Sequence, residues 1–268
     1  MKRIGVLLCG AAFVLAGCVS GGGNMSSAVS ETGAERPIMD LPPTNAAERA
    51  AQVHVELGTA YVEIGRYDVA LDEARIALAY QSGYPPAFHL MGIVYTFIED
   101  NTAARENFLR ALRAAPNDPD FNNSYGWFLC LNGAEQEGLR RLDLAARNPY
   151  YRFPARPHTN AGLCQLRLDD VAAAEGHFRR ALALQAENAV ALYWLAELAQ
   201  RQGDYLAAQR HLVALHRLAE PTPESAWLGL RVERKLGNHH AEASYAAQLS
   251  GRFRNSPEYQ AMTRGEYE

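Results

Sequence analysis

Lysine is almost absent from this 268-residue chain, in which Lys2 and Lys235 are the only lysines and arginine supplies the other positive charges. With 26 basic and 30 acidic residues the net charge is −4, so we expect no basic face of the kind that binds a nucleic-acid backbone. The 4 cysteines are too few for a disulfide-dense scaffold. Hydrophobic residues form 48% of the chain and charged residues 21%, which excludes a chain disordered throughout and a protein of many membrane spans.

The sequence also lacks the motifs of common catalytic and cofactor sites, among them GxSxG, the phosphate-binding P-loop and HExxH. His239 and His240 are adjacent, so their side chains point in different directions on a helix. No Cys or Asp completes a metal site with them and Glu242. We therefore predict a protein that is not an enzyme, with no cofactor, no metal and no small-molecule substrate.

The first 17 residues have the pattern of an export signal. Lys2 and Arg3 precede an apolar run at 4–15, which is shorter than the about 20 residues of a membrane-spanning helix and has the length of a signal-peptide core. The LAGC sequence at 15–18 resembles the lipobox of bacterial lipoproteins. That resemblance implies cleavage before Cys18 and lipidation of Cys18, with more than one acyl chain for stable anchoring. The alternative is an ordinary secretory signal followed by an unrelated cysteine.

The residues after Cys18 suggest where the anchor lies and how the next domain begins. In lipoproteins of this kind an Asp at the following position commonly causes retention in the inner membrane, and this chain has Val19. The resemblance thus implies an outer-membrane anchor facing the periplasm. Residues 19–44 are rich in Gly, Ser and Pro without an apolar period, so we expect a flexible tether that spans roughly 25–30 Å. Asn45 and Glu48 have the spacing of a capping box at the first helix.

An internal period of 34 residues organises the rest of the chain. Four glycines expected at close contacts between helices follow spacings of 34, 34 and 36 residues: Gly58, Gly92, Gly126 and Gly162. A second set, expected in the turn inside each repeat, follows spacings of 34, 34, 36, 34 and 34 residues: Gly65, Glu99, Gly133, Asp169, Gly203 and Gly237. The two sets share one period and one insertion, which indicates a true repeat.

At this period the chain resembles the tetratricopeptide repeat, a helix-turn-helix unit. Residues 85–118 match the pattern best, from Phe88 and Gly92 to Pro116. We therefore predict an all-α fold, a right-handed solenoid of about six repeats. The expected parts of the chain are a signal peptide at 1–17, the lipidated Cys and tether at 18–44, five repeats at 45–222, a degenerate sixth repeat or cap at 223–256, and a C-terminal tail at 257–268.

Two cysteines, Cys130 and Cys164, remain if Cys9 is removed with the signal and Cys18 is lipidated. Both lie on the first helices of adjacent repeats at similar heights, and the periplasm is oxidising. We predict that they form a disulfide, provided that their Cα atoms lie within ~7 Å. The alternative is a pair of buried free thiols, which behave as small hydrophobic side chains.

Tetratricopeptide proteins usually bind ligands on the concave surface formed by the first helix of each repeat. In repeats one to three this surface is mainly apolar, which suits an amphipathic helix or an extended apolar segment of a partner. The Lys/Asn clamp by which chaperone-binding members hold carboxylates is absent. The predicted partner-binding residues are Val55, Thr59, Val62, His89, Ile93, Phe97, Asn123, Trp127 and Leu131.

The lipobox, the tether and the repeats together resemble the type IV pilus biogenesis lipoproteins (the PilF/PilW family), which are pilotins of the pilus secretin. The local resemblance lies in 122–130, 148–151 and 159–164, which include the paired cysteines and the loop that lengthens repeat three. It implies transport by the lipoprotein-sorting machinery to the outer membrane, binding of the secretin subunit and promotion of its localisation and multimerisation. The alternative is a tetratricopeptide lipoprotein of another envelope machine, in β-barrel assembly or peptidoglycan-synthase regulation.

Overall fold

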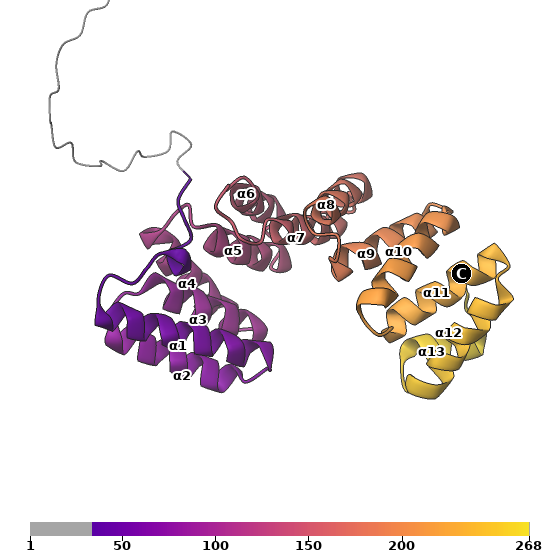
Figure 1. Ribbon diagram of the computed structural model, residues 1–268, viewed down its shortest axis with the longest axis horizontal. Coiled ribbons are helices and arrows are strands. Elements are labelled where there is room, and N and C mark those ends of the chain that lie inside the picture. The colour runs from indigo at the N-terminus through magenta and orange to yellow at the C-terminus, as the bar shows by residue number, and fades with distance from the viewer. Residues whose placement is uncertain (1–33, 268) are drawn as a thin grey trace, which may run out of the picture. The chain divides into compact units, whose positions relative to one another are not determined.

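The computed structural model describes residues 34–267, and all regular structure in this range is helical (Figure 1). A short 3₁₀ helix, η1 (Ile38–Asp40), comes first, six helix pairs follow, and one further helix ends the chain. The helices are α1 (Ala46–Glu63), α2 (Tyr67–Tyr80), α3 (Pro85–Phe97), α4 (Asn101–Ala114), α5 (Pro119–Leu131), α6 (Glu135–Ala146), α7 (Ala155–Arg167), α8 (Val171–Leu184), α9 (Ala189–Arg201), α10 (Tyr205–Leu218), α11 (Pro223–Leu236), α12 (His239–Arg252) and α13 (Pro257–Arg264).

Each helix pair is one repeat, and neighbouring repeats stack on one another. The first helix of a pair packs against its own second helix, and α1, α3, α5 and α7 also contact one another in succession. The last pair is part of the same stack, since α11 contacts both α9 and α10. The predicted all-α tetratricopeptide fold is confirmed.

In each repeat, the turn between the two helices contains one residue with a left-handed backbone conformation. These residues are the second periodic set of the sequence analysis, from Gly65 to Gly237. The φ angles of Gly65, Gly133, Gly203 and Gly237 lie between 71° and 80°, and Glu99 and Asp169 adopt φ of 62° and 58°. An L residue in this region bears a steric cost, which explains why glycine recurs there. A side-chain N-cap follows the turn in four of the repeats. The side-chain oxygens of Asp100, Asp170, Asp204 and Asn238 each accept a hydrogen bond from the amide three residues later.

The start of α1 differs slightly from the predicted capping box. The side chain of Asn45 accepts a hydrogen bond from the Glu48 amide at 2.8 Å, as expected of an N-cap. The Glu48 carboxylate, however, accepts from the amide of Thr44 at 2.7 Å rather than from the amide of Asn45. The second hydrogen bond of the predicted capping box is therefore made to Thr44, the residue before the N-cap.

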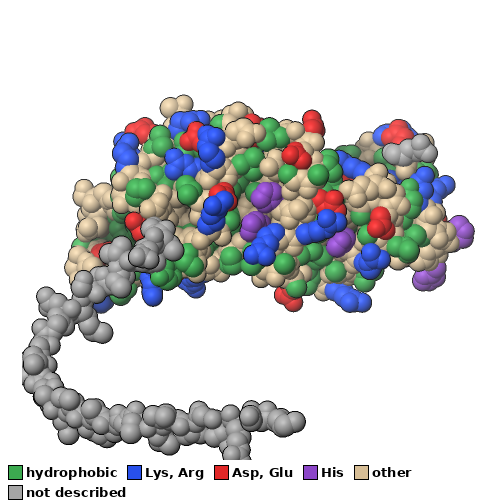
Figure 2. All heavy atoms as spheres, turned by 90° about the horizontal axis from the view of Figure 1, so that it is seen from above, with side chains coloured by type: hydrophobic (Ala, Val, Ile, Leu, Met, Phe, Trp, Pro, Cys, Tyr) green, Lys and Arg blue, Asp and Glu red, His purple; other side chains and the backbone are tan. Residues whose placement is uncertain are grey.

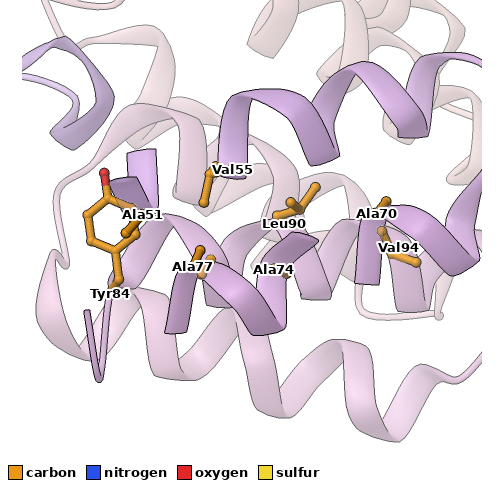
Figure 3. Close-up of a cluster of buried hydrophobic side chains, with 9 residues drawn as sticks. Ala51, Val55, Ala70, Ala74, Ala77, Tyr84, Leu90 and Val94 are labelled. Atoms are coloured by element: carbon orange, nitrogen blue, oxygen red, sulfur yellow. The ribbon is translucent and has the colours of Figure 1, made fainter. Parts of the chain in front are cut away.

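The periodic glycines lie where two helices or a helix and a large side chain approach most closely. In the core of repeats one and two, small residues such as Ala70 and Ala74 face α1 (Figure 3). A Cβ at Gly58 would lie 2.5 Å from Leu90 Cδ2, and a Cβ at Gly92 would lie 2.7 Å from the Phe108 ring. Gly126 and Gly162 are equally confined, by backbone and side chain of α6 and by the Phe178 ring respectively. No side chain larger than hydrogen fits at these positions without displacing a neighbour.

The C-terminal residues form a helix where the sequence analysis expected a tail. The side chain of Ser256 caps α13 by accepting from the Tyr259 amide at 3.1 Å. Tyr259 and Met262 then pack against the buried Leu230 and Leu249 of the last repeat. The three-residue spacing of these two apolar side chains places both on one face of α13, which covers the end of the stack.

Residues 34–40 differ from the flexible tether that was predicted for this part of the chain. Pro37 is buried, and the side chain of Ile38 packs on the core of repeats two and three. The Ile38 amide donates to Asp118 Oδ2 at 2.9 Å. The predicted signal peptide, the predicted lipidation site Cys18 and residues 19–33 lie outside the described residues.

Candidate functional site

The first helices of repeats one to three form a groove that contains two adjoining cavities. The larger has a volume of about 410 Å³ and lies between α1, α3 and the start of α5. The smaller, of about 300 Å³, lies between the ends of α3 and α5. Ile93, Asn123 and Ser124 line both cavities, so the two form one continuous surface, which we call the groove.

The structure brings eight of the nine predicted partner-binding residues to the groove. The larger cavity is lined by Val55, Thr59, His89, Ile93 and Asn123, and the smaller by Ile93, Asn123, Phe97, Trp127 and Leu131. Val62 lines neither and instead packs against the core of the first repeats. Val55 has both roles, since it lines the cavity while its side chain is also part of that core.

An exposed aromatic ring marks the smaller cavity. The side chain of Phe97 at the end of α3 is 56% exposed, and its ring is stacked on Tyr67 with a centroid distance of 5.3 Å. Trp127 lies on α5, one repeat further on, and is partly buried. Large aromatic side chains held on rigid helices lose little conformational entropy when a partner covers them, which suits them as anchors of a protein interface.

The larger cavity contains three titratable groups whose pKa values are shifted toward the neutral form, and for Asp118 the direction is upward because of burial. Burial lowers the pKa of His89 to about 4, and its ring lies 4.8 Å from that of Phe121. Burial, followed by the nearby Asp118 carboxylate, raises the pKa of Asp120 to about 6, against the opposing effects of Tyr151 and Arg156. Near neutral pH the histidine is therefore uncharged, whereas Asp120 is still mostly ionised, and this part of the groove combines charged side chains with apolar ones.

Several residues of the larger cavity were missed by the sequence analysis. Three of them come from outside the first helices of the repeats, Met39 from the segment before α1 and Arg152 and Phe153 from the loop after α6, and Arg156 comes from the start of α7. The only relevant signal in the sequence was the insertion that lengthens repeat three. The repeat pattern assigns ligand positions to the first helices alone and gives no role to inserted loop residues.

The two predicted disulfide partners are joined in the structure. Cys130 on α5 and Cys164 on α7 form a disulfide with a Cα–Cα distance of 5.5 Å. Both side chains are fully buried beside Leu142. The bond links repeats three and four behind the end of the groove that Trp127 lines. It therefore fixes the spacing of the two first helices α5 and α7.

Polar contacts reinforce the same junction. Asn160 on α7 donates to Asn123 Oδ1 at 3.0 Å, so that a groove residue of α5 is held from the next repeat. Asn122, which is fully buried, donates to the carbonyl oxygens of Pro116 and Asp118 at 2.8 and 2.9 Å. These bonds satisfy buried amide groups and fix the start of α5.

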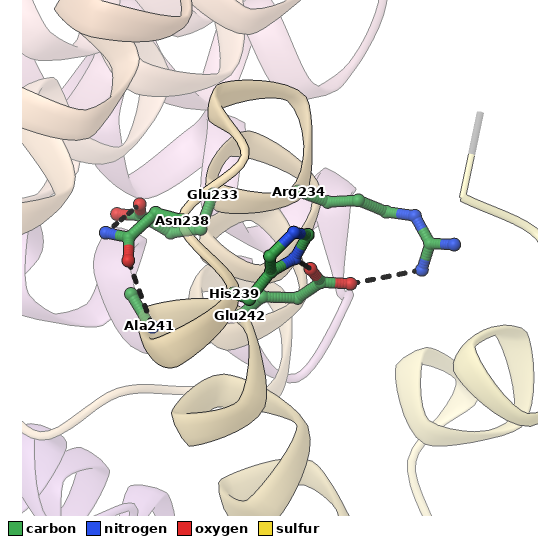
Figure 4. A network of polar contacts seen from close by, with 6 residues as sticks. All are labelled: Glu233, Arg234, Asn238, His239, Ala241 and Glu242. Atoms are coloured by element: carbon green, nitrogen blue, oxygen red, sulfur yellow. Dashed lines mark hydrogen bonds and ion pairs between the residues drawn. The ribbon is translucent and has the colours of Figure 1, made fainter.

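The histidine pair considered as a metal ligand lies at the turn between α11 and α12. His239 Nδ1 is 3.4 Å from Glu242 Oε2, while Arg234 Nη1 holds the other oxygen at 3.2 Å (Figure 4). Among the described residues no group of three or more His, Cys, Asp or Glu side chains is arranged to hold a metal ion. On the face shown in Figure 2, acidic and basic side chains are interspersed among hydrophobic ones.

A membrane-spanning element is not found in the described part of the chain. Within residues 34–267, every helix is too short or too polar to cross a bilayer.

Comparison with known proteins relates this fold to the type IV pilus machinery. The tetratricopeptide repeat profile matches residues 85–118. The chain is 24% identical over 213 residues to the type IV pilus assembly protein PilF of Pseudomonas aeruginosa, which covers 80% of this chain and 84% of that protein. The solved structure of Pseudomonas aeruginosa PilF has a TM-score of 0.75 at 24% identity and covers 82% of this chain and 100% of its own.

A second solved structure agrees with this relationship. PilW, described as a widely conserved type IV pilus biogenesis factor, has a TM-score of 0.70 at 27% identity and covers 80% of this chain and 98% of its own. The chain is a tetratricopeptide-repeat protein, similar in sequence and in fold to the type IV pilus proteins PilF and PilW.

Proposed function

We propose that this protein is an outer-membrane lipoprotein that binds the secretin subunit of the type IV pilus machine and promotes its localisation and multimerisation in the outer membrane. It acts by binding and co-transport, without catalysis. The observation that carries the proposal is the groove. Its smaller cavity presents apolar and aromatic side chains from α3 and α5, among them Ile93, Phe97 and Trp127, as a site for an apolar partner segment requires.

Two sequence features support the membrane part of the proposal. The lipobox at 15–18 supplies Cys18 for lipidation, and Val19 follows it in place of the Asp that favours the inner membrane. An anchored binding protein would then be carried with its bound partner by the lipoprotein-sorting machinery. The similarity to PilF and PilW supports the pilus as the machine concerned.

The groove assignment is tested by placing carboxylates on it. In the double variant Phe97→Asp, Trp127→Asp, an unpaired charge would be buried under an apolar partner, which costs several kcal/mol. We expect secretin multimers in outer membranes and twitching motility to fall at least tenfold. The same membranes, crosslinked and precipitated through this protein, should contain the secretin with the wild type and little of it with the double variant.

A matched control separates this effect from a general loss of folding. Leu206 on α10 is 58% exposed and lies outside the groove, and Leu206→Asp places one carboxylate there, against two in the double variant. Normal multimers and motility in the double variant, with a helical circular dichroism spectrum like that of the control, would reject the groove. Capture of a β-barrel-assembly or peptidoglycan-synthase component in place of the secretin would favour the alternative envelope machine.

A further inference from the structure

The segment 34–40, which we call the strap, lies against the solenoid through apolar contacts on two repeats. Ile38 packs on the core that contains Phe121, and Met39 packs on the core of repeats one and two. The Tyr84 hydroxyl donates to the Met39 sulfur at 3.7 Å. Figure 1 shows the strap, in indigo, running beside α4 and α5 before the chain turns back into α1.

A buried carboxylate joins the strap to the start of α5. Asp118 is 1% exposed, and its Oδ1 caps α5 by accepting from the amides of Asp120 and Phe121 at 2.9 and 3.1 Å. Its other oxygen accepts from the Ile38 amide at 2.9 Å. Without the strap, this oxygen would lose its hydrogen-bond donor within the described residues, which is unfavourable for a buried charged group.

The loop after α6 supplies the remaining contacts. Asn148 donates to the Glu35 carbonyl at 2.9 Å, and Arg152 forms an ion pair with Asp40 at 2.9 Å. The Arg36 guanidinium lies 5.3 Å from the centre of the Tyr150 ring. This loop contains the two inserted residues that lengthen the spacing from 34 to 36 in repeat three. The insertion thus has a structural role, because the strap packs against the enlarged loop.

The docked strap also borders the groove. Met39 lines the larger cavity together with Arg152, Phe153 and Arg156 of the loop region, while Thr59 and His89 line it from the first helices. The end of the cavity is therefore formed by elements that are far apart in the sequence.

We infer that the strap is a fixed wall of the groove, docked by the enlarged loop of repeat three, and that an apolar side chain of the partner segment packs against Met39 and Phe153 at this end. The inference deepens the proposed function and rests on it.

The docking of the strap is tested by hydrogen exchange on the full chain in detergent. In the wild type we expect the Ile38 amide and its neighbours to exchange at least a hundredfold more slowly than an unstructured peptide. The double variant Ile38→Asp, Met39→Asp should lose this protection, whereas the helices α3 and α5 should keep theirs. Leu41→Asp is the control, because Leu41 follows the strap and is 46% exposed. Rapid exchange of residues 34–40 in the wild type would overturn the inference.

The role of the strap in binding is tested by secretin capture from crosslinked outer membranes. We expect the strap variant to capture at least fivefold less secretin than Leu41→Asp. Equal capture would show that the strap is docked but forms no part of the binding surface, and increased capture would show a lid; either result overturns the inference. Normal secretin capture by Phe97→Asp, Trp127→Asp would instead reject the groove as the binding site, and with it the role of the strap as a wall of that site. The hydrogen-exchange result would still show whether the strap is docked on the solenoid.

Discussion

Gly138 on α6 lies directly against the disulfide, and a Cβ at this position would be 2.5 Å from Cys130 Sγ and 2.6 Å from the Gly126 carbonyl oxygen. Other repeats have a small alanine at the equivalent position, such as Ala70 and Ala104. Repeat three uses glycine because the cystine sulfur and the backbone of α5 together occupy the volume of a methyl group.

The first prediction is that Gly138→Ala destabilises the protein although alanine favours helices. The added methyl group must displace a backbone carbonyl or the cystine, and overpacking of this kind costs about 1–3 kcal/mol. Urea denaturation measures the change. The control is Gly176→Ala on α8, where nothing lies within 4 Å of the added Cβ and a gain of about 0.5–1 kcal/mol is expected. A stabilised Gly138→Ala variant would contradict the close contact.

The second prediction concerns the disulfide, which links cysteines 34 residues apart. Closing a loop of this length restricts the unfolded chain and stabilises the fold by about 3–4 kcal/mol in the loop-entropy model. The double variant Cys130→Ala, Cys164→Ala should lose about this amount in urea denaturation. Adding a reductant should destabilise the wild type and leave the double variant unchanged. An equal response of the two proteins to the reductant would show that the bond is not formed.

Much of the fold follows from local rules that a single sequence displays. The turn positions were predictable because a left-handed backbone favours glycine at each repeat, and the N-caps because an Asp follows that turn. The disulfide and most of the groove followed from the register of the repeat. These features depend on residues within one repeat or on equivalent positions in adjacent repeats.

The strap and the wall of the groove could not be predicted in this way. Ile38 and Met39 lie in a segment without an apolar period, so no local pattern assigns them to a core. Their partners are distant, since Asp118 is 80 residues from Ile38 and Asn148 is 113 residues from Glu35. Contacts of this kind leave no periodic signal. Helix α13 was missed because only two apolar side chains attach it to the last repeat through α11 and α12.

The third prediction tests the backbone role of the turn glycines. Gly133 has a φ of 77°, and nothing lies within 4 Å of a Cβ added there. Any loss on Gly133→Ala therefore reflects backbone strain rather than packing, and we expect about 1 kcal/mol. Thermal unfolding followed at 222 nm measures it against Gly176→Ala, which should shift the Tm in the opposite direction. Equal shifts in the two variants would contradict the left-handed turn.

The fourth prediction is a pair of opposite pH dependences in the larger cavity. Asp120 has a pKa raised to about 6, so the folded state binds its proton more tightly than the unfolded state, and this group makes stability fall as pH rises from about 4 to 6. His89 has a pKa lowered to about 4, so the unfolded state binds the extra proton and stability rises between about pH 4 and 6.5. Other groups add to both slopes, because burial also raises the pKa of Asp118 and lowers the pKa of four further histidines: His158, His177, His211 and His216. The contributions of Asp120 and His89 are therefore read as differences from the wild-type profile.

Single variants should separate these slopes. Asp120→Asn removes the falling contribution, so relative to the wild type its unfolding free energy should rise by on the order of 2 kcal/mol between pH 4 and 6.5. His89→Gln removes the rising one, and relative to the wild type its stability should fall by a similar amount over the same range. Urea denaturation at half-unit intervals of pH measures both, with Gly176→Ala as a reference whose profile should keep the shape of the wild-type profile. If both variants also kept that shape, the two groups would titrate alike in the folded and unfolded states, and the larger cavity would be open to water rather than enclosed by the strap and the loop.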